Sequence, residues 1–193
     1  MPGSPHIDIY PNQIHKRQRM DELKVYFGIL QAAGTRHDRR LVGRIANRVG
    51  GLRKKASKEL VGECLSVYAG GCPELNHLFN VQPHSNTAQP TEQAFGWLLA
   101  VKYLQDNQSL TIETTRAVIN RIIGVNEREL DALLARCLQA HVHTATRMHK
   151  PADIHGDLMQ VLRVSKLRHD RETETAAHNG LARVYLATGQ WDM

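Results

Sequence analysis

Basic side chains are concentrated in one short part of the chain. Between residues 36 and 58 there are nine Lys or Arg residues and one Asp, a net charge of +8, whereas the whole 193-residue chain carries +6. The basic residues are Arg36, Arg39, Arg40, Arg44, Arg48, Arg53, Lys54, Lys55 and Lys58. Guanidinium and ammonium groups bind phosphate oxygens, so a concentrated patch of them predicts a polyanionic partner.

Four arginines of this patch recur at a spacing of four residues, at positions 36, 40, 44 and 48. Apolar residues fall on a neighbouring face, a pattern typical of an amphipathic helix with a cationic ridge. Like charges four residues apart destabilise a helix slightly, and phosphate groups would relieve that repulsion. A solvated helix face is the simpler interpretation. The scarcity of acidic residues nevertheless favours contact with nucleic acid.

Cysteine and histidine could hold a metal. The cysteines, Cys64, Cys72 and Cys137, are odd in number and favour free, buried thiols in a reducing compartment. His141, His143 and His149 follow Cys137 closely, but their spacing matches no zinc motif. We therefore expect no metal and no cofactor, with these histidines at the surface or facing nucleic acid. No catalytic motif is present, which favours a binding protein over an enzyme.

Composition is that of a globular domain, with 41% hydrophobic and 23% charged residues. No apolar run reaches the length needed to span a bilayer, and the first residues lack the hydrophobic core of a signal peptide. The sequence predicts a cytoplasmic protein without a membrane partner.

Apolar residues recur with helical spacing along nearly the whole chain, which predicts an all-α fold of two packed bundles with seven to eight helices. The expected organisation is a flexible tail at 1–16, an N-terminal bundle at 17–108 and a C-terminal bundle at 109–193. We detect no internal repeat. Ser57, Asn126 with Glu129, and Asp153 are the predicted helix caps.

Several short segments resemble the CasB family, the small subunit of the type I-E CRISPR Cascade complex of antiviral defence. They are Tyr26-Phe-Gly-Ile-Leu, His37-Asp-Arg-Arg-Leu-Val-Gly-Arg-Ile, the helix at 94–104, Asn126-Glu-Arg-Glu-Leu-Asp-Ala-Leu-Leu and Asp153-Ile-His-Gly-Asp-Leu-Met-Gln-Val-Leu. The similarity is diffuse and extends over most of residues 20–188.

This resemblance implies a non-catalytic helical subunit that holds guide RNA and separated target DNA strands within a ribonucleoprotein complex. It places Arg39, Arg40, Arg44 and Arg48 on a first basic helix. It also implies nucleic-acid contacts for Arg128 and Arg147. The expected partners are RNA and DNA, bound mainly through the phosphate backbone, together with other subunits of the complex; homodimer formation is left open.

Two other interpretations remain. Residues 110–134 have the outline of a helix-turn-helix, which would make the chain a DNA-binding regulator. Alternatively, the chain is a protein–protein adaptor whose basic patch docks an acidic protein.

Overall fold

The computed structural model describes residues 11–36, 38–52, 57–69, 71–82, 88–125 and 127–190, with side chains from residue 17 onward except at 33–35 and 49–52. These residues form nine α-helices and no strand, which confirms the all-α prediction and exceeds the expected number of helices by one. The helices are α1 (Pro11–Thr35), α2 (Arg39–Leu52), α3 (Lys58–Tyr68), α4 (Pro73–Phe79), α5 (Pro90–Asp106), α6 (Ile112–Gly124), α7 (Asp131–Arg147), α8 (His155–Arg168) and α9 (Arg171–Thr188).

Helix boundaries follow local capping chemistry. Ser57 caps α3 as predicted, since its hydroxyl accepts a hydrogen bond from the Leu60 amide at 3.2 Å. The cap predicted at Asp153 is wrong, because a 3₁₀ turn, η3 (Pro151–Ile154), leads directly into α8. Asn126 lies outside the described residues, and α7 begins after another 3₁₀ turn, η2 (Arg128–Leu130). Helix α1 begins at Pro11, six residues before the predicted start, while residues 1–10 lie outside the described part.

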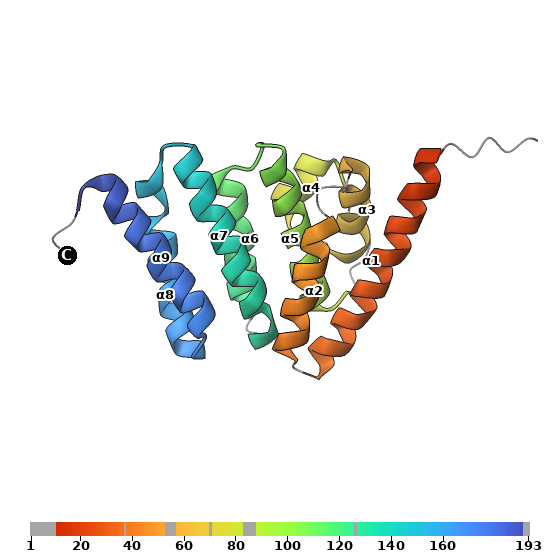
Figure 1. The fold of residues 1–193 in the computed structure, drawn as a ribbon, viewed down its shortest axis with the longest axis horizontal. Helices are drawn as coiled ribbons and strands as arrows, with labels where there is room; N and C mark the ends of the chain where they lie inside the picture. Colours follow the sequence, from red (N-terminus) through yellow and green to blue (C-terminus); the bar gives the residue numbers. More distant parts are fainter. Residues whose placement is uncertain are drawn as a thin grey trace, which may run out of the picture.

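The helices form a stacked array rather than a closed ring (Figure 1). Helices α5, α7 and α9 lie side by side in one layer, and α4, α6 and α8 lie behind them. Consecutive helices pack as pairs, most extensively α6 with α7 and α8 with α9. The hairpin of α1 and α2 packs on α5 and α7, and α3 packs against α5.

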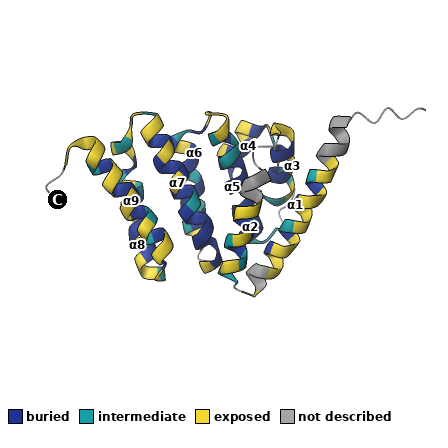
Figure 2. Ribbon diagram, in the orientation of Figure 1, coloured by how far each residue is buried: buried dark blue, intermediate teal, exposed yellow. Residues whose placement is uncertain are grey.

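One contiguous cluster of buried apolar side chains runs from Met20 on α1 to Val184 on α9 (Figure 2). Helix α5 lies at its centre and buries most of its residues, because α1, α2, α3, α6 and α7 all contact it. The predicted bundle boundary at 108/109 falls in the turn between α5 and α6, and the division into two bundles stays a prediction.

Two glycines allow the helices to approach closely. A Cβ on Gly96 of α5 would lie 2.5 Å from the Ala69 Cβ at the end of α3, next to the 2.9 Å hydrogen bond from the Trp97 indole to the Ala69 carbonyl. A Cβ on Gly180 of α9 would lie 3.0 Å from the Val142 Cγ2 of α7. Stacking of the array therefore depends on the absence of a side chain at both positions.

The substitution Gly96→Ala should destabilise the chain by about 1–3 kcal/mol, because overpacking against Ala69 outweighs the gain in helix propensity. Gly28→Ala is the matched control. Gly28 is also inside a helix, but its Cβ would meet nothing within 4 Å, so propensity alone should stabilise the chain by about 0.5–1 kcal/mol. Denaturant unfolding measures both; equal effects of the two substitutions would refute the close approach.

Candidate functional groove

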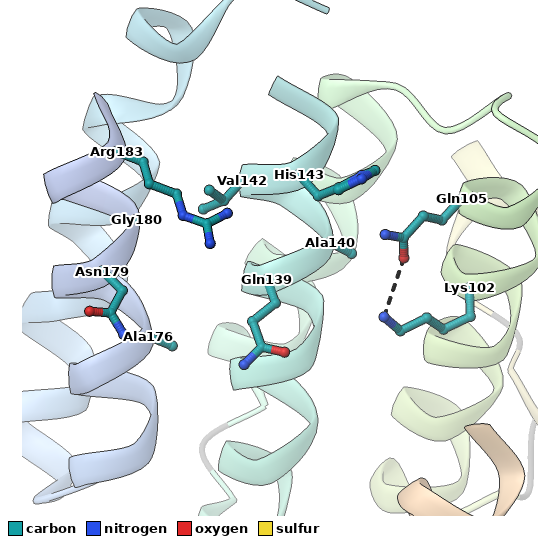
Figure 3. A pocket seen from close by; sticks show the side chains of 10 residues that line it. All are labelled: Lys102, Gln105, Gln139, Ala140, Val142, His143, Ala176, Asn179, Gly180 and Arg183. Atoms are coloured by element: carbon teal, nitrogen blue, oxygen red, sulfur yellow. Dashed lines mark hydrogen bonds between the residues drawn. The ribbon is translucent and has the colours of Figure 1, made fainter. Parts of the chain in front are cut away.

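A groove of about 390 Å³ crosses the exposed face of the α5–α7–α9 layer (Figure 3). Small or apolar side chains form its floor, with Ala140, Val142 and Gly180 all buried. Its remaining lining residues are Lys102, Gln105, Gln139, His143, Ala176, Asn179 and Arg183. The floor is thus set by the close packing of α7 and α9, and longer side chains stand around it.

The polar groups around this groove carry positive charge or are neutral, because its described lining includes no Asp or Glu. Arg183 reaches from α9 toward α7, and His143 points from α7 toward α5 (Figure 3). The Lys102 ammonium donates to the Gln105 side-chain oxygen at 3.2 Å across one turn of α5. Such a surface can accept carboxylates through charge-assisted hydrogen bonds.

A second depression of about 680 Å³ adjoins the first, and Arg183 lines both. Its other lining residues are Thr146, His149, Pro151, Leu186 and Ala187. Leu186 is 53% exposed, so its apolar side chain is available at the edge of this depression. The combined surface has a polar, cationic part toward α5 and a more apolar part at the end of α9.

The basic patch predicted from the sequence is partly free at the surface. Arg40, Arg44 and Arg48 are exposed along α2 and form a cationic ridge of three arginines, whereas Arg36, the fourth predicted member, precedes the helix. Lys58 is exposed at the start of α3. Residues 53–55, which complete the patch, lie outside the described residues.

Arg39 has a different role from its neighbours. Its guanidinium contacts the carboxylate of Asp170, and it lies 4.0 Å from both Asp131 and Glu172. Asp131 and Asp170 are buried, so Arg39 joins α2 to α7 and α9 inside the fold. The sequence predicts a phosphate contact for Arg39. It cannot show that this basic residue is already paired with acidic residues far along the chain.

The two more distant predicted arginines also differ from each other. Arg147 is exposed but donates to the carbonyl oxygens of Gln108 at 2.8 Å and Leu110 at 2.6 Å, which fixes the turn between α5 and α6. Arg128 is exposed in η2. Arg147 is therefore used within the fold, whereas Arg128 lies in a turn that packs against α2.

The helix-turn-helix outline does not correspond to a DNA-reading element. Helix α7, which would be the recognition helix, lies between α5 and α9 in the layer and buries most of its residues. Glu129, near its start, is also buried. A recognition helix needs one exposed polar face that can enter a groove of DNA, and most of α7 is covered by neighbouring helices.

A buried polar network joins α6, α7 and α8. His141 is fully buried, with its Nδ1 2.5 Å from the Thr115 hydroxyl and its Nε2 2.9 Å from the Asp157 carboxylate. Arg116 donates from Nε to both oxygens of Asp157 at 2.9 Å. The prediction of a surface position for His141 is therefore wrong. Although Thr, His and Asp side chains meet here, Thr115 and His141 have no access to solvent, so the network is structural.

Burial lowers the pKa of His141, although the hydrogen bond to Asp157 opposes this shift. A depressed pKa in the folded state means that the stability is fully present above the ordinary value of about 6.5 and is lost as the pH falls below it. We expect the free energy of unfolding to decrease from pH 7 to pH 5 in the native chain and to depend less on pH in His141→Gln. His143→Gln, on the exposed side of the same helix, should keep the native pH dependence, and identical slopes in all three proteins would contradict this assignment.

The cysteines are not poised for chemistry. Burial raises the pKa of the Cys64 and Cys137 thiols to about 12, and all three cysteines are buried and unpaired, as predicted. Across the described ranges no three His, Cys, Asp or Glu side chains are grouped so as to hold a metal ion. Likewise, no helix in the described part is long and apolar enough to cross a membrane.

Stacked pairs of antiparallel helices in two layers, with one face of a layer left open, define the class of α-helical repeat proteins. The chain belongs to the family described as PSMD3-like, N-terminal TPR repeats, which it matches over residues 73–193. This range begins at α4 and contains both layers of the array and the whole groove.

The chain is also similar to the probable 26S proteasome non-ATPase regulatory subunit 3 of Anopheles stephensi. The two are 29% identical over 106 residues, which cover 54% of this chain and 21% of the mosquito protein. The chain therefore spans about a fifth of the length of this relative.

These comparisons overturn the assignment to the CasB family, and with it the CRISPR function and the RNA and DNA partners. The segments behind that resemblance are short and lie on or beside α1, α2, α5, α7 and α8, and apolar residues at helical spacing are common to all-α proteins. The prediction that the chain is not an enzyme is confirmed by its membership of a family of TPR helical repeats.

The sequence carries one sign of the repeat character that we did not predict. Helix α9 contains Leu181-Ala182-Arg183-Val184-Tyr185, close to the L-G-x-x-Y segment of a tetratricopeptide repeat with Ala in place of Gly. We found no internal repeat because the rest of the 34-residue signature is degenerate here.

Proposed function

We propose that the chain is a non-catalytic protein–protein adaptor that works with a proteasome regulatory assembly. The observation that carries this proposal is the open face of the α5–α7–α9 layer, which lies within the region of family similarity and is not covered by another described helix at the groove. The proteasome is chosen as the assembly because the mosquito relative is named as one of its regulatory subunits. A cytoplasmic location, predicted from the sequence, fits this proposal.

The cationic ridge of α2 offers a second contact surface in this proposal. Arg40, Arg44 and Arg48 are exposed, whereas Arg39 pairs with Asp170 within the fold. Arg136 on α7 donates to the Asn47 side chain at 2.5 Å, between Arg44 and Arg48, and Gln139 at the groove is one turn further along α7. The ridge and the groove are therefore close neighbours, and an acidic protein surface could cover both.

Affinity purification of the full tagged chain, followed by nuclease treatment and mass spectrometry, tests this function. We expect named proteasome regulatory subunits to be recovered in constant proportion to the chain, with and without nuclease. Recovery of nucleic acid whose removal releases all bound proteins, or absence of every proteasome subunit, would refute the proposal.

A further inference from the structure

We infer that the groove binds an extended, acidic polypeptide segment that carries an apolar side chain at one end. This inference rests on the proposed function and specifies the chemistry of the partner. It depends on three features of the described residues: the Arg183 guanidinium without a described partner, side-chain amides without described partners, and an exposed apolar residue beside them.

The positive charge of Arg183 is not neutralised by any described residue. Many other arginines of the array are engaged, as Arg116 is by Asp157, Arg121 by Glu74 and Arg168 by Asp131. Arg183, by contrast, is exposed on α9 and makes no hydrogen bond or ion pair with any described residue. A guanidinium group held over a concave surface that has no acidic lining residue is a preformed site for a carboxylate.

Hydrogen-bonding groups surround this charge. Asn179 lies one turn before Arg183 on α9, and Gln139 faces it from α7 (Figure 3). Neither side chain has a hydrogen-bond partner among the described residues, so both can bind the backbone of a guest segment. An extended acidic chain offers both carboxylates, which can pair with the guanidinium group, and peptide groups, which can hydrogen-bond to the side-chain amides. Phosphates would pair with the guanidinium group but would leave the amides without such partners.

The second depression predicts an apolar side chain at one end of the bound segment. Leu186 and Pro151 line it next to Arg183, so a segment whose carboxylate contacts Arg183 would place its next side chains over Leu186. Neighbouring packed helices are about 9 Å apart, so the path from α5 to α9 is about 18 Å long. At roughly 3.3 Å per residue, five or six extended residues would cross it.

Titration of the purified full chain with a short fluorescent peptide tests the inference. The peptide carries several glutamates and ends in leucine. We expect saturable binding that weakens with salt and falls about tenfold or more in Arg183→Glu. Arg163→Glu is the matched control, because Arg163 is exposed on α8 in the other layer and the change of charge is the same. Asn179→Asp, a second exposed change, should weaken binding in the same direction.

Two further binding measurements identify the chemistry of the bound segment. Replacing the terminal leucine of the peptide by serine should weaken binding to the native chain but not to Leu186→Ser, because the two side chains form one contact. A single-stranded oligonucleotide of equal charge should bind less tightly than the peptide. Equal loss in Arg183→Glu and Arg163→Glu, or tighter binding of the oligonucleotide, would overturn the inference.

The inference and the proposed function fail in different ways. If Arg183→Glu abolishes peptide binding and the variant chain still recovers the proteasome subunits, the adaptor function stands and another surface, such as α2, makes that contact. If the native chain binds the peptide but recovers no proteasome subunit, the groove chemistry stands and the proposed assembly is wrong. Absence of peptide binding to the native chain overturns the inference alone.

Discussion

Replacing Arg168 by Met should destabilise the chain by about 3 kcal/mol, because it leaves a buried carboxylate without its main partner. Arg168 donates to Asp131 at 3.1 Å and to the Ile123 carbonyl at 3.0 Å, and its side chain is only 9% exposed. Asp131 itself is 1% exposed, and its backbone carbonyl accepts from the Thr173 hydroxyl at 3.1 Å. This network joins α6, α7, α8 and α9 at one end of the stack.

The loss of stability in Arg168→Met should increase with pH. Burial raises the pKa of Asp131 above its usual range, and Arg168 opposes that rise. Without Arg168 the pKa should rise further, so the variant keeps its stability at acidic pH and loses it as the pH increases through the raised pKa. We therefore expect Arg168→Met to be more destabilising at pH 8 than at pH 5, as measured by denaturant unfolding.

Two further variants make this prediction specific. Adding Asp131→Asn to Arg168→Met should recover part of the lost stability and remove its pH dependence, because the unpaired charge is gone. Arg163→Met, on the exposed side of α8, should change stability by less than about 0.5 kcal/mol. A loss in Arg168→Met that is independent of pH would show that Asp131 is not the group left unpaired.

Phe27→Ala should destabilise the chain by about 3–5 kcal/mol, the range for removing a buried aromatic ring. Phe27 is 1% exposed, and its ring stacks on Tyr68 of α3 with centroids 3.8 Å apart. It also meets the Phe95 ring of α5 edge to face at 5.5 Å. Since α1 precedes the region of family similarity, this contact makes the first helices part of the same core.

Denaturant unfolding of the full chain measures this effect, with Val25→Ala as the control. Val25 lies on the opposite side of α1 and is 61% exposed, so its removal should change stability by less than about 0.5 kcal/mol. If α1 were attached only loosely, Phe27→Ala would leave the main unfolding transition unchanged, and that result would refute a common core.

Much of the fold could be predicted from the sequence, because helical periodicity and capping residues act locally. The helix from Lys58 to Tyr68 illustrates this: Ser57 and the apolar spacing define it without reference to the rest of the chain. The start of α8 shows the limit, since a 3₁₀ turn, η3, lies where the sequence predicts a helix cap at Asp153. Such choices depend on tertiary packing.

The candidate site could not be predicted, because it consists of residues that lack a recognisable motif. The groove joins side chains from three helices spaced about forty residues apart, such as Lys102, Gln139 and Arg183. The sequence did reveal the cationic ridge of α2, but its charge was assigned to the wrong class of partner. Arg39 shows why: a count of charges cannot separate an arginine that pairs with Asp170 from one that stays exposed.

Site-specific photo-crosslinking in cells tests whether the groove contacts a proteasome subunit. A photoreactive residue at position 179 would lie at the groove, and one at position 160 would lie on the exposed side of α8 as the matched control. We expect position 179 to crosslink to an identified proteasome subunit and position 160 not to do so. We also expect Arg183→Glu to remove the crosslink. Crosslinks from position 179 to nucleic acid, or equal capture of the same proteins from both positions, would contradict it.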